Sequence, residues 1–267
     1  MIIRVYKGYG SAQNGTPILI NEFKRHLDAD VAGISENEMK TSKGWLRETS
    51  LIVFAGKSVG AFKEALGPII LGTLKQSITE GAFDYMGICA GAAFASAGIK
   101  YRMKPIDSGK TLVIRNTGLS LSDIFASGPC REVSPLPFSG GSDDLKLITL
   151  RSTADWESYK SFHWGGPALI PTQAIQPSRG RALSFLKDSA LPMSLHFKCG
   201  EGNVTLCSHH PEINAENIGV WAEARFIPKE ETTRLETLAK ELDGTAFKRL
   251  LEDAGLKQYL IPHLNAA

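Results

Sequence analysis

The sequence feature that most constrains the fold is a cysteine between two glycines, in the segment Gly87-Ile-Cys-Ala-Gly91. An apolar segment from Phe83 precedes it, and a run of small residues follows as far as Gly98. We interpret this pattern as a strand that turns abruptly into a helix. Side chains on either side of such a turn would collide with the neighbouring strand and helix, so both flanking positions need glycine. The pattern predicts that Cys89 lies at the carboxyl edge of a parallel sheet, where ligands of open α/β folds bind.

The chain before this turn alternates between strand and helix patterns. Apolar periodicity predicts strands at 2–6, 30–34 and 50–56, and helices over 16–27 and 61–78. The continuous apolar run at 50–56 is typical of a parallel strand that is buried on both faces. This alternation predicts an α/β fold, an open sheet built from βαβ units with right-handed crossovers.

The segment from 101 to 171 has a different character and is richer in β patterns. It contains two β-rich pieces, 111–114 and 145–150, and a loop rich in Ser, Pro and Gly over 135–144. We expect a β-rich elaboration attached to the sheet rather than a separate domain. A hairpin is expected farther along the chain, over 194–208.

The C-terminal part is expected to be helical. Residues 229–259 read as two amphipathic helices joined near 243–244, and we interpret their charged residues as a solvated face. The predicted organisation is therefore one α/β domain over residues 1–227 and a C-terminal helical extension, 228–267, packed on the same domain.

Composition excludes several classes of protein. The 267 residues include 30 basic and 28 acidic ones, for a net charge of +2, which argues against a nucleic-acid binder. No apolar run reaches the roughly 18–20 residues that span a bilayer, and the N-terminal apolar stretch is too short for a signal-peptide core. Four cysteines in so long a chain do not make a disulfide framework. We expect a cytoplasmic protein with reduced thiols and no membrane contact.

A cysteine nucleophile needs a base, and the base needs a group that orients it. The segment His209-His-Pro-Glu212 supplies both, directly after an apolar strand that ends at Cys207. The rigid proline favours a turn that holds Glu212 near the imidazole of His210. We therefore predict Cys89 as nucleophile, His210 as base and Glu212 as its orienting group. The alternatives are a small buried cysteine in a tight turn and a solvated loop with incidental histidines.

The order of these motifs resembles the class I glutamine amidotransferase superfamily. More closely, the chain resembles the amidotransferase-like domain at the N-terminus of eukaryotic biotin-protein ligases, which also occurs alone in some bacteria. The resemblance implies a flavodoxin-like parallel sheet flanked by helices, a triad of Cys89, His210 and Glu212, and an oxyanion site formed by the backbone amides of Gly56 and Ala90. The matching segments are Val5-Tyr-Lys-Gly8, Val53-Phe-Ala-Gly56, Tyr85-Met-Gly-Ile-Cys-Ala-Gly-Ala92, His163-Trp-Gly-Gly-Pro167 and Ser208-His-His-Pro-Glu212.

Two positions depart from the amidotransferase pattern. Enzymes that hydrolyse glutamine usually carry Gln two residues after the second elbow glycine, where this chain has Ala93. This difference argues against glutamine as the substrate. The family's second glycine after the third strand is Lys57 here. Its side chain either binds an acidic group of the substrate beside the oxyanion site or is simply solvated.

The segment around Trp164 allows two interpretations. Gly165 and Gly166 could let the backbone approach a substrate in front of Cys89, or they could form an ordinary tight turn beside a packed tryptophan. We include Trp164, Gly165 and Gly166 among the candidate substrate residues.

A cluster of histidines and cysteines near the expected hairpin raises the question of zinc. Structural zinc sites use closely spaced Cys or His pairs, whereas these cysteines are widely separated and two of the histidines are adjacent. We therefore predict no metal site and no cofactor. The residues concerned are His196, Cys199, Cys207, His209 and His210.

The predicted function is that of a cysteine-dependent amidase or amidotransferase-like hydrolase, with a Cys-His-Glu triad, an acyl-enzyme intermediate and a small-molecule amide or acyl substrate. One alternative is a catalytically silent small-molecule-binding or regulatory module, and another is a redox-sensing thiol at Cys89. The fold occupies the whole 267 residues, so this chain alone is not expected to be a complete biotin ligase.

Overall fold

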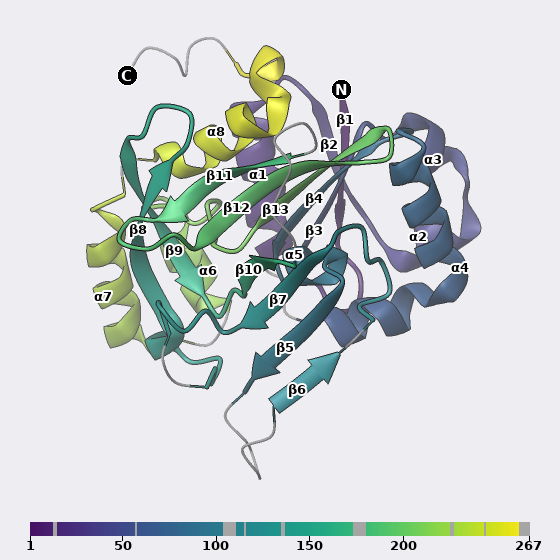
Figure 1. The fold of residues 1–267 in the computed structure, drawn as a ribbon. Helices are drawn as coiled ribbons and strands as arrows, with labels where there is room; N and C mark the ends of the chain where they lie inside the picture. The colour runs from purple at the N-terminus through teal and green to yellow at the C-terminus, as the bar shows by residue number, and fades with distance from the viewer. Residues whose placement is uncertain are drawn as a thin grey trace.

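A computed structural model places a large mixed sheet at the centre of the molecule, with helices on both sides (Figure 1). The residues that the structure describes are 1–12, 15–56, 58–103, 111–114, 116–134, 137–172, 180–224, 227–242 and 244–261.

The central sheet has nine strands in the order β2-β1-β3-β4-β13-β12-β11-β8-β9. Its first five strands are mutually parallel, and the remaining pairings are antiparallel. The parallel strands are β1 (Ile2–Tyr6), β2 (Asp30–Ile34), β3 (Leu51–Gly56), β4 (Asp84–Cys89) and β13 (Gly202–Cys207). The others are β12 (Pro192–Cys199), β11 (Gly180–Leu186), β8 (Leu145–Ser152) and β9 (Ser158–Trp164).

A second, smaller sheet has four strands in the order β10-β7-β5-β6. The predicted β-rich elaboration is therefore divided between two sheets, because β8 and β9 extend the central sheet while its other strands form the second one. The strands of the second sheet are β5 (Gly98–Arg102), β6 (Thr111–Ile114), β7 (Ile124–Gly128) and β10 (Ala168–Pro171).

Helices cover both faces of the parallel half. On one face, α1 (Gly15–His26) and α8 (Thr245–Leu251) bring Phe23 and Phe247 together, with ring centroids 5.1 Å apart. On the other face, α4 (Val59–Thr79) and α5 (Ala90–Ala95) pack Phe62 against Phe94. The remaining helices are α2 (Glu36–Thr41), α3 (Gly44–Glu48), α6 (Ile218–Glu223) and α7 (Lys229–Ala239), with short 3-10 or π turns at Ser142–Asp144, Glu252–Leu256 and Lys257–Tyr259.

The side chains of β3 explain why its sequence is continuously apolar. Leu51 and Val53 pack in the core cluster that contains Phe23 of α1, while Ile52 and Phe54 pack in the cluster under α4 and α5. Successive strand residues point to opposite faces, and here both faces are covered. The sequence prediction of an α/β fold with a helix-flanked parallel sheet is confirmed.

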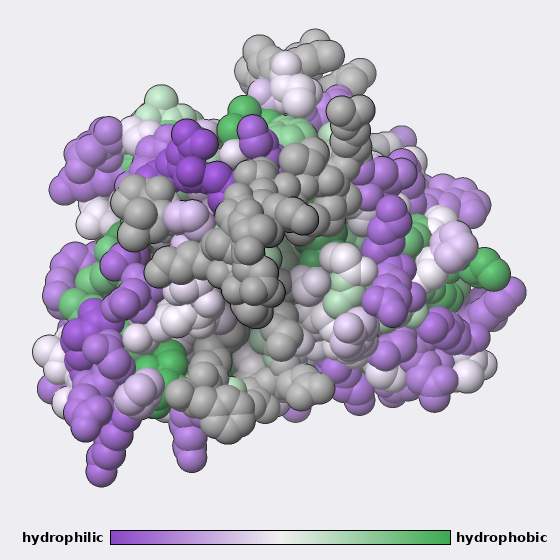
Figure 2. All heavy atoms as spheres, turned by 90° about the horizontal axis from the view of Figure 1, so that it is seen from below, coloured by the Kyte–Doolittle hydropathy of each residue, from purple (hydrophilic) through white to green (hydrophobic). Residues whose placement is uncertain are grey.

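The surface seen from below carries hydrophilic side chains along both flanks, with apolar residues in separate small patches (Figure 2). Within the described part of the chain, none of the helices has the length and apolar character that crossing a membrane requires.

Candidate active site

Cys89 occupies a strained turn between β4 and α5. Strand β4 ends at Cys89, α5 begins at Ala90, and the backbone angles of Cys89 are φ 54° and ψ −109°. A positive φ is uncommon for a residue other than glycine, and strain of this kind gathers at functional sites. A strained strand-to-helix turn is also the geometry that exposes the nucleophile in α/β hydrolases.

The two glycines of the turn have no room for a side chain. A Cβ on Gly91 would lie 1.8 Å from the carbonyl oxygen of Phe54 in β3, and a Cβ on Gly87 would lie 2.5 Å from the carbonyl group of Gly91. Both distances are far below van der Waals contact. The glycines therefore let β4, α5 and the neighbouring strand approach closely enough to form the turn.

The antiparallel half of the sheet curls back toward this turn. Three strands (β12, β11 and β8) separate β9 from β13 in the sheet order, yet Phe162 of β9 forms an isolated bridge with His210, which follows β13. The amide of His210 donates to the carbonyl oxygen of Phe162 at 2.7 Å. Two residues farther along β9, the carbonyl oxygen of Trp164 lies 3.8 Å from the sulfur of Cys89.

His210 and Glu212 form a buried pair. The Nδ1 atom of His210 donates to Oε1 of Glu212 at 2.8 Å, and both side chains are less than a tenth exposed. Burial lowers the pKa of His210, but the charges of Glu212 and Cys89 outweigh it and raise that pKa from 6.5 to about 10. The Nε2 atom of His210 is buried and has no hydrogen-bond partner within the described residues. The structure thus brings Cys89, His210 and Glu212 together.

The neighbouring His209 has a different environment. Its Nδ1 lies 2.8 Å from the hydroxyl of Ser161, and its Nε2 lies 3.1 Å from that of Ser194. Burial, with smaller effects of His163 and His210, lowers the pKa of His209 to about 3. A neutral histidine with both nitrogens occupied is part of the core, so His210 is the better candidate base.

No group of three or more His, Cys, Asp or Glu residues with metal-binding geometry occurs within the described ranges. His196, which the sequence places near the same histidines, lies with its Nδ1 3.0 Å from the hydroxyl of Thr205.

Two aromatic residues that the sequence did not single out, Tyr101 and Phe138, pack around Trp164, whose carbonyl oxygen lies near Cys89. The hydroxyl of Tyr101 in β5 donates to the carbonyl oxygen of Gly165. The ring of Phe138 packs edge-on against the rings of Tyr101 and Trp164, with centroids 6.0 and 5.2 Å away. We call Tyr101, Phe138 and Trp164 the aromatic wall.

The aromatic wall is hydrogen-bonded to a turn that contains Asp144. The carboxylate of Asp144 accepts from the amide and the hydroxyl of Ser139, at 2.7 and 2.5 Å, and from the amide of Gly140 at 2.7 Å. The indole nitrogen of Trp164 donates to the carbonyl oxygen of Gly141. Burial, and then the charges of Cys89 and Asp144, raise the pKa of Tyr101. Cys89 and the turn that contains Asp144 therefore both act on the Tyr101 hydroxyl.

Gly165 and Gly166 have steric reasons to be glycine. Gly165 has a φ of 69°, and a Cβ there would lie 2.5 Å from the ring of Phe138. A Cβ on Gly166 would lie 1.7 Å from the carbonyl oxygen of Ser208. These contacts support the interpretation of the segment as a tight turn. That the turn also lets the backbone approach a substrate stays a prediction.

The candidate oxyanion residues lie beside Cys89. Gly56, the last residue of β3, is the register partner of Cys89 across the β3–β4 pair, and Ala90 opens α5. A Cβ on Gly56 would lie 2.6 Å from the carbonyl oxygen of Gly10, so this edge of the sheet is also closely packed. Lys57 lies outside the described residues.

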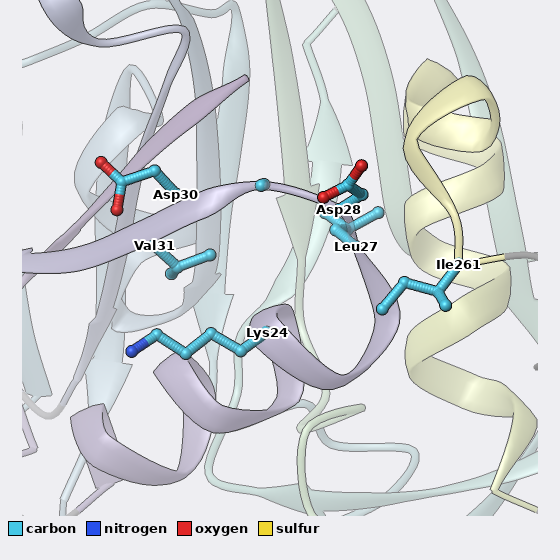
Figure 3. A pocket seen from close by; sticks show the side chains of 7 residues that line it. Lys24, Leu27, Asp28, Asp30, Val31 and Ile261 are labelled. Atoms are coloured by element: carbon cyan, nitrogen blue, oxygen red, sulfur yellow. The ribbon is translucent and has the colours of Figure 1, made fainter.

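An open pocket of about 460 Å³ lies elsewhere on the molecule (Figure 3). It is lined by residues at the end of α1 and the start of β2, including Lys24, Asp28 and Asp30, and by Ile261. Because β2 begins at Asp30 and runs parallel to the strands that end near Cys89, the pocket is at the opposite edge of the sheet. Cys89 is not among its lining residues and is itself 9% exposed.

Known proteins provide a second line of evidence. The family model described as "Biotin-protein ligase, N terminal" matches residues 1–260. The biotin–protein ligase of Schizosaccharomyces pombe is 24% identical over 199 residues, which make up 73% of this chain and 30% of that protein. The chain therefore spans less than a third of the length of this relative.

Solved structures of glutamine amidotransferases resemble the fold. One aligns with a TM-score of 0.54 and 14% identity over 96% of this chain and 100% of its own. Another, from Thermotoga maritima, aligns with a TM-score of 0.50 and 14% identity over 94% and 98% of the two chains. At this identity the likeness concerns the fold alone. Together with the match over residues 1–260, it shows that the chain belongs to the family of biotin-protein ligase N-terminal domains and has a glutamine amidotransferase-like fold.

Proposed function

We propose that this protein is a cysteine-dependent amidase or amidotransferase-like hydrolase that works through an acyl-enzyme. One observation carries the proposal: Cys89 sits in a strained turn beside a histidine whose other nitrogen is held by a buried glutamate at 2.8 Å. A nucleophile, a base and an orienting group in this order are the parts that acyl transfer requires.

The proposed reaction begins with a proton on His210 and a thiolate on Cys89. The sulfur attacks the carbonyl carbon of an amide, and the backbone amides of Gly56 and Ala90 stabilise the resulting oxyanion. His210 then gives its proton to the leaving nitrogen, the C–N bond breaks, and an amine or ammonia departs. Water, deprotonated by His210, attacks the thioester. The carboxylic acid leaves, and the thiolate and the protonated imidazole are restored.

The substrate is proposed to be a small amide or acyl compound other than glutamine. Ala93, which stands where glutamine-hydrolysing relatives carry Gln, is fully buried in the core cluster under α4 and α5. This position therefore offers no polar group to a substrate. The carbonyl oxygen of Trp164, a residue of the aromatic wall, lies 3.8 Å from the sulfur of Cys89, which favours a compact acyl group.

The proposal is tested by trapping the acyl-enzyme. The full chain is incubated with nitrophenyl esters and primary amides of short carboxylic acids, and intact mass spectrometry with peptide mapping locates any acyl group. We expect acylation at Cys89, its loss in Cys89→Ser at neutral pH, and slower acylation in His210→Gln. Cys199→Ser, which removes a partly exposed thiol, serves as the control and should acylate normally. Turnover that persists in Cys89→Ala would refute the proposal.

A second candidate function, a catalytically silent binding module, is favoured by the low exposure of Cys89 and by Ala93. Such a module would show ligand-dependent melting that survives Cys89→Ser, without formation of product. Acyl-enzyme trapping and melting therefore distinguish the two functions directly.

A further inference from the structure

Asn217, five residues after Glu212, connects two acidic residues from distant parts of the chain. Its side-chain nitrogen donates to the main-chain carbonyl oxygen of Glu212 at 2.8 Å and to Oε1 of Glu22 at 3.2 Å. Its side-chain oxygen accepts from the amide of Asn214 at 3.0 Å. Every polar atom of this side chain is therefore engaged.

Asn217 stands at the N-cap position of α6, but its side chain does not cap that helix. Asn217 precedes α6, where an asparagine side chain usually accepts a hydrogen bond from the first helical amides. Here the side chain caps no amide of the helix. Its hydrogen bonds are directed to the turn that carries Glu212 and to helix α1.

Glu22 is a firmly held partner. Its side chain is 8% exposed, and it lies 3.5 Å from Nε2 of His26 and 4.0 Å from Nη1 of Arg25, both in α1. Helix α1 is anchored in the core by Leu19 and Phe23, which are almost completely buried. A buried carboxylate needs hydrogen-bond donors, so the contact with Asn217 also benefits Glu22.

Glu212 needs such support. Only its Oε1 atom contacts His210, while Oε2 is buried without a hydrogen-bond partner in the described part of the chain. Within the turn itself, the amide of Ile213 donates to the carbonyl oxygen of His210 at 3.3 Å, which is long. The 2.8 Å bond from Asn217 is shorter, and it acts on the main chain of Glu212 itself.

We infer that Asn217 and Glu22 are positioning residues that hold the Glu212 turn against His210 and tie it to helix α1. The inference rests on the proposed function, because it matters only if His210 and Glu212 act as base and orienting group. The hydrogen bonds and ion pairs of Asn217 and Glu22 do not involve Cys89, so their effect would reach the thiol through His210.

The test follows the protonation of His210 by NMR in the full-length chain labelled with ¹⁵N-histidine. Of the six histidines, the His210 signal is identified by its loss in His210→Gln. In the wild type we expect His210 to stay protonated well above pH 6.5. In Asn217→Ser, which retains a good helix-capping residue, we expect its proton affinity to fall about tenfold, the size of one charge-assisted hydrogen bond.

A matched control comes from the other end of the sheet. The side-chain nitrogen of Asn203 donates to both carboxylate oxygens of Asp84 at 3.0 Å, so Asn203→Ser removes the same kind of bridge far from the triad. It should leave the His210 titration unchanged. If Asn217→Ser shifts the titration no more than Asn203→Ser does, the inference is wrong.

A second pair of variants keeps the test valid if Asn217→Ser does not fold. Glu22→Gln and Glu22→Ala both remove the charge, but only alanine removes the acceptor for Asn217. A positioning role predicts a larger fall in His210 proton affinity for alanine than for glutamine, and equal shifts would contradict it. If the wild-type His210 itself titrates near pH 6.5, the proposed triad fails, and that result is distinct from an effect of Asn217.

Discussion

The turn at Gly87–Gly91 carries Cys89 and the aromatic wall lies near it, but the two are built in different ways. The turn consists of five consecutive residues, and backbone atoms fix its shape: Gly91 meets the carbonyl oxygen of Phe54. The wall brings together Tyr101, Phe138 and Trp164, and side-chain packing holds it. Backbone contacts at this distance cannot relax, whereas packed side chains can. We therefore expect the turn to determine the chemistry and the wall to determine which acyl groups enter.

The largest expected effect comes from placing one methyl group in the turn. Gly91→Ala puts a Cβ 1.8 Å from a backbone oxygen, and we expect a loss of more than about 4 kcal/mol in the free energy of unfolding, or no folded protein. The control is Gly72→Ala in α4, where nothing lies within 4 Å of the new Cβ. That change should stabilise the protein by about 0.5–1 kcal/mol. Urea unfolding measures the stability of both variants. A small loss of stability in Gly91→Ala would show that backbone contacts do not fix the shape of the turn.

A smaller effect is expected in the aromatic wall. Phe138→Ala removes the ring that packs on Tyr101 and Trp164, and should cost about 2–3 kcal/mol because the ring is only partly buried. The thiol should then react faster with a bulky maleimide, relative to iodoacetamide, than it does in the wild type. Phe138→Leu keeps most of the volume and should retain the wild-type ratio. An unchanged ratio in Phe138→Ala would show that the wall does not limit access.

Two adjacent histidines should give opposite pH dependences of stability. The pKa of His210 is raised from 6.5 to about 10, so its contribution is fully present below pH 6.5 and is lost as pH rises toward 10. The pKa of His209 is lowered to about 3, so its contribution is present above pH 6.5 and is lost as pH falls toward 3.

Unfolding measured from pH 4 to pH 10 tests this pair of effects. His210→Gln should flatten the alkaline side of the stability curve, and His209→Gln should flatten the acid side. If His210→Gln leaves the alkaline side as steep as in the wild type, the buried ion pair with Glu212 does not exist in solution.

The smallest expected effect is that of a single hydroxyl in the wall. Tyr101→Phe leaves the carbonyl oxygen of Gly165 without this donor, at a cost of about 1 kcal/mol in unfolding free energy. The rate at which iodoacetamide alkylates Cys89 should change less than about twofold, because the ring stays in place. A large change in this rate would mean that the hydroxyl takes part in the chemistry. The aromatic wall would then affect the reactivity of Cys89 as well as access to it.

The contrast also explains which parts of the site could be predicted from the sequence. The turn and the His210-Pro-Glu212 segment are local patterns whose steric and hydrogen-bonding demands appear in consecutive residues. The choice of His210 over His209 followed from the proline turn. Tyr101, Phe138 and Asp144 could not be found, because they meet only after the antiparallel half curls back toward Cys89.

The fold likewise has parts that local sequence patterns predict and parts that depend on long-range pairing. The buried strands of the parallel half are continuous apolar runs and were predicted, whereas the assignment of strands between the two sheets depends on long-range pairing that no local pattern reveals. One missed signal was local. Ser35 caps α2, with its hydroxyl accepting from the amide of Glu38 and the Glu38 carboxylate accepting from the amide of Ser35, which is a readable helix start.

The alkylation rate of each cysteine against pH, in the wild type and in His210→Gln, tests the central claim most directly. Iodoacetamide and peptide-level mass spectrometry separate Cys89 from the partly exposed Cys199. We predict that Cys89 is alkylated the faster of the two at neutral pH, because thiolates rather than thiols react, and that His210→Gln slows this reaction. A wild-type Cys89 that is inert, or that His210→Gln leaves unchanged, would contradict the account.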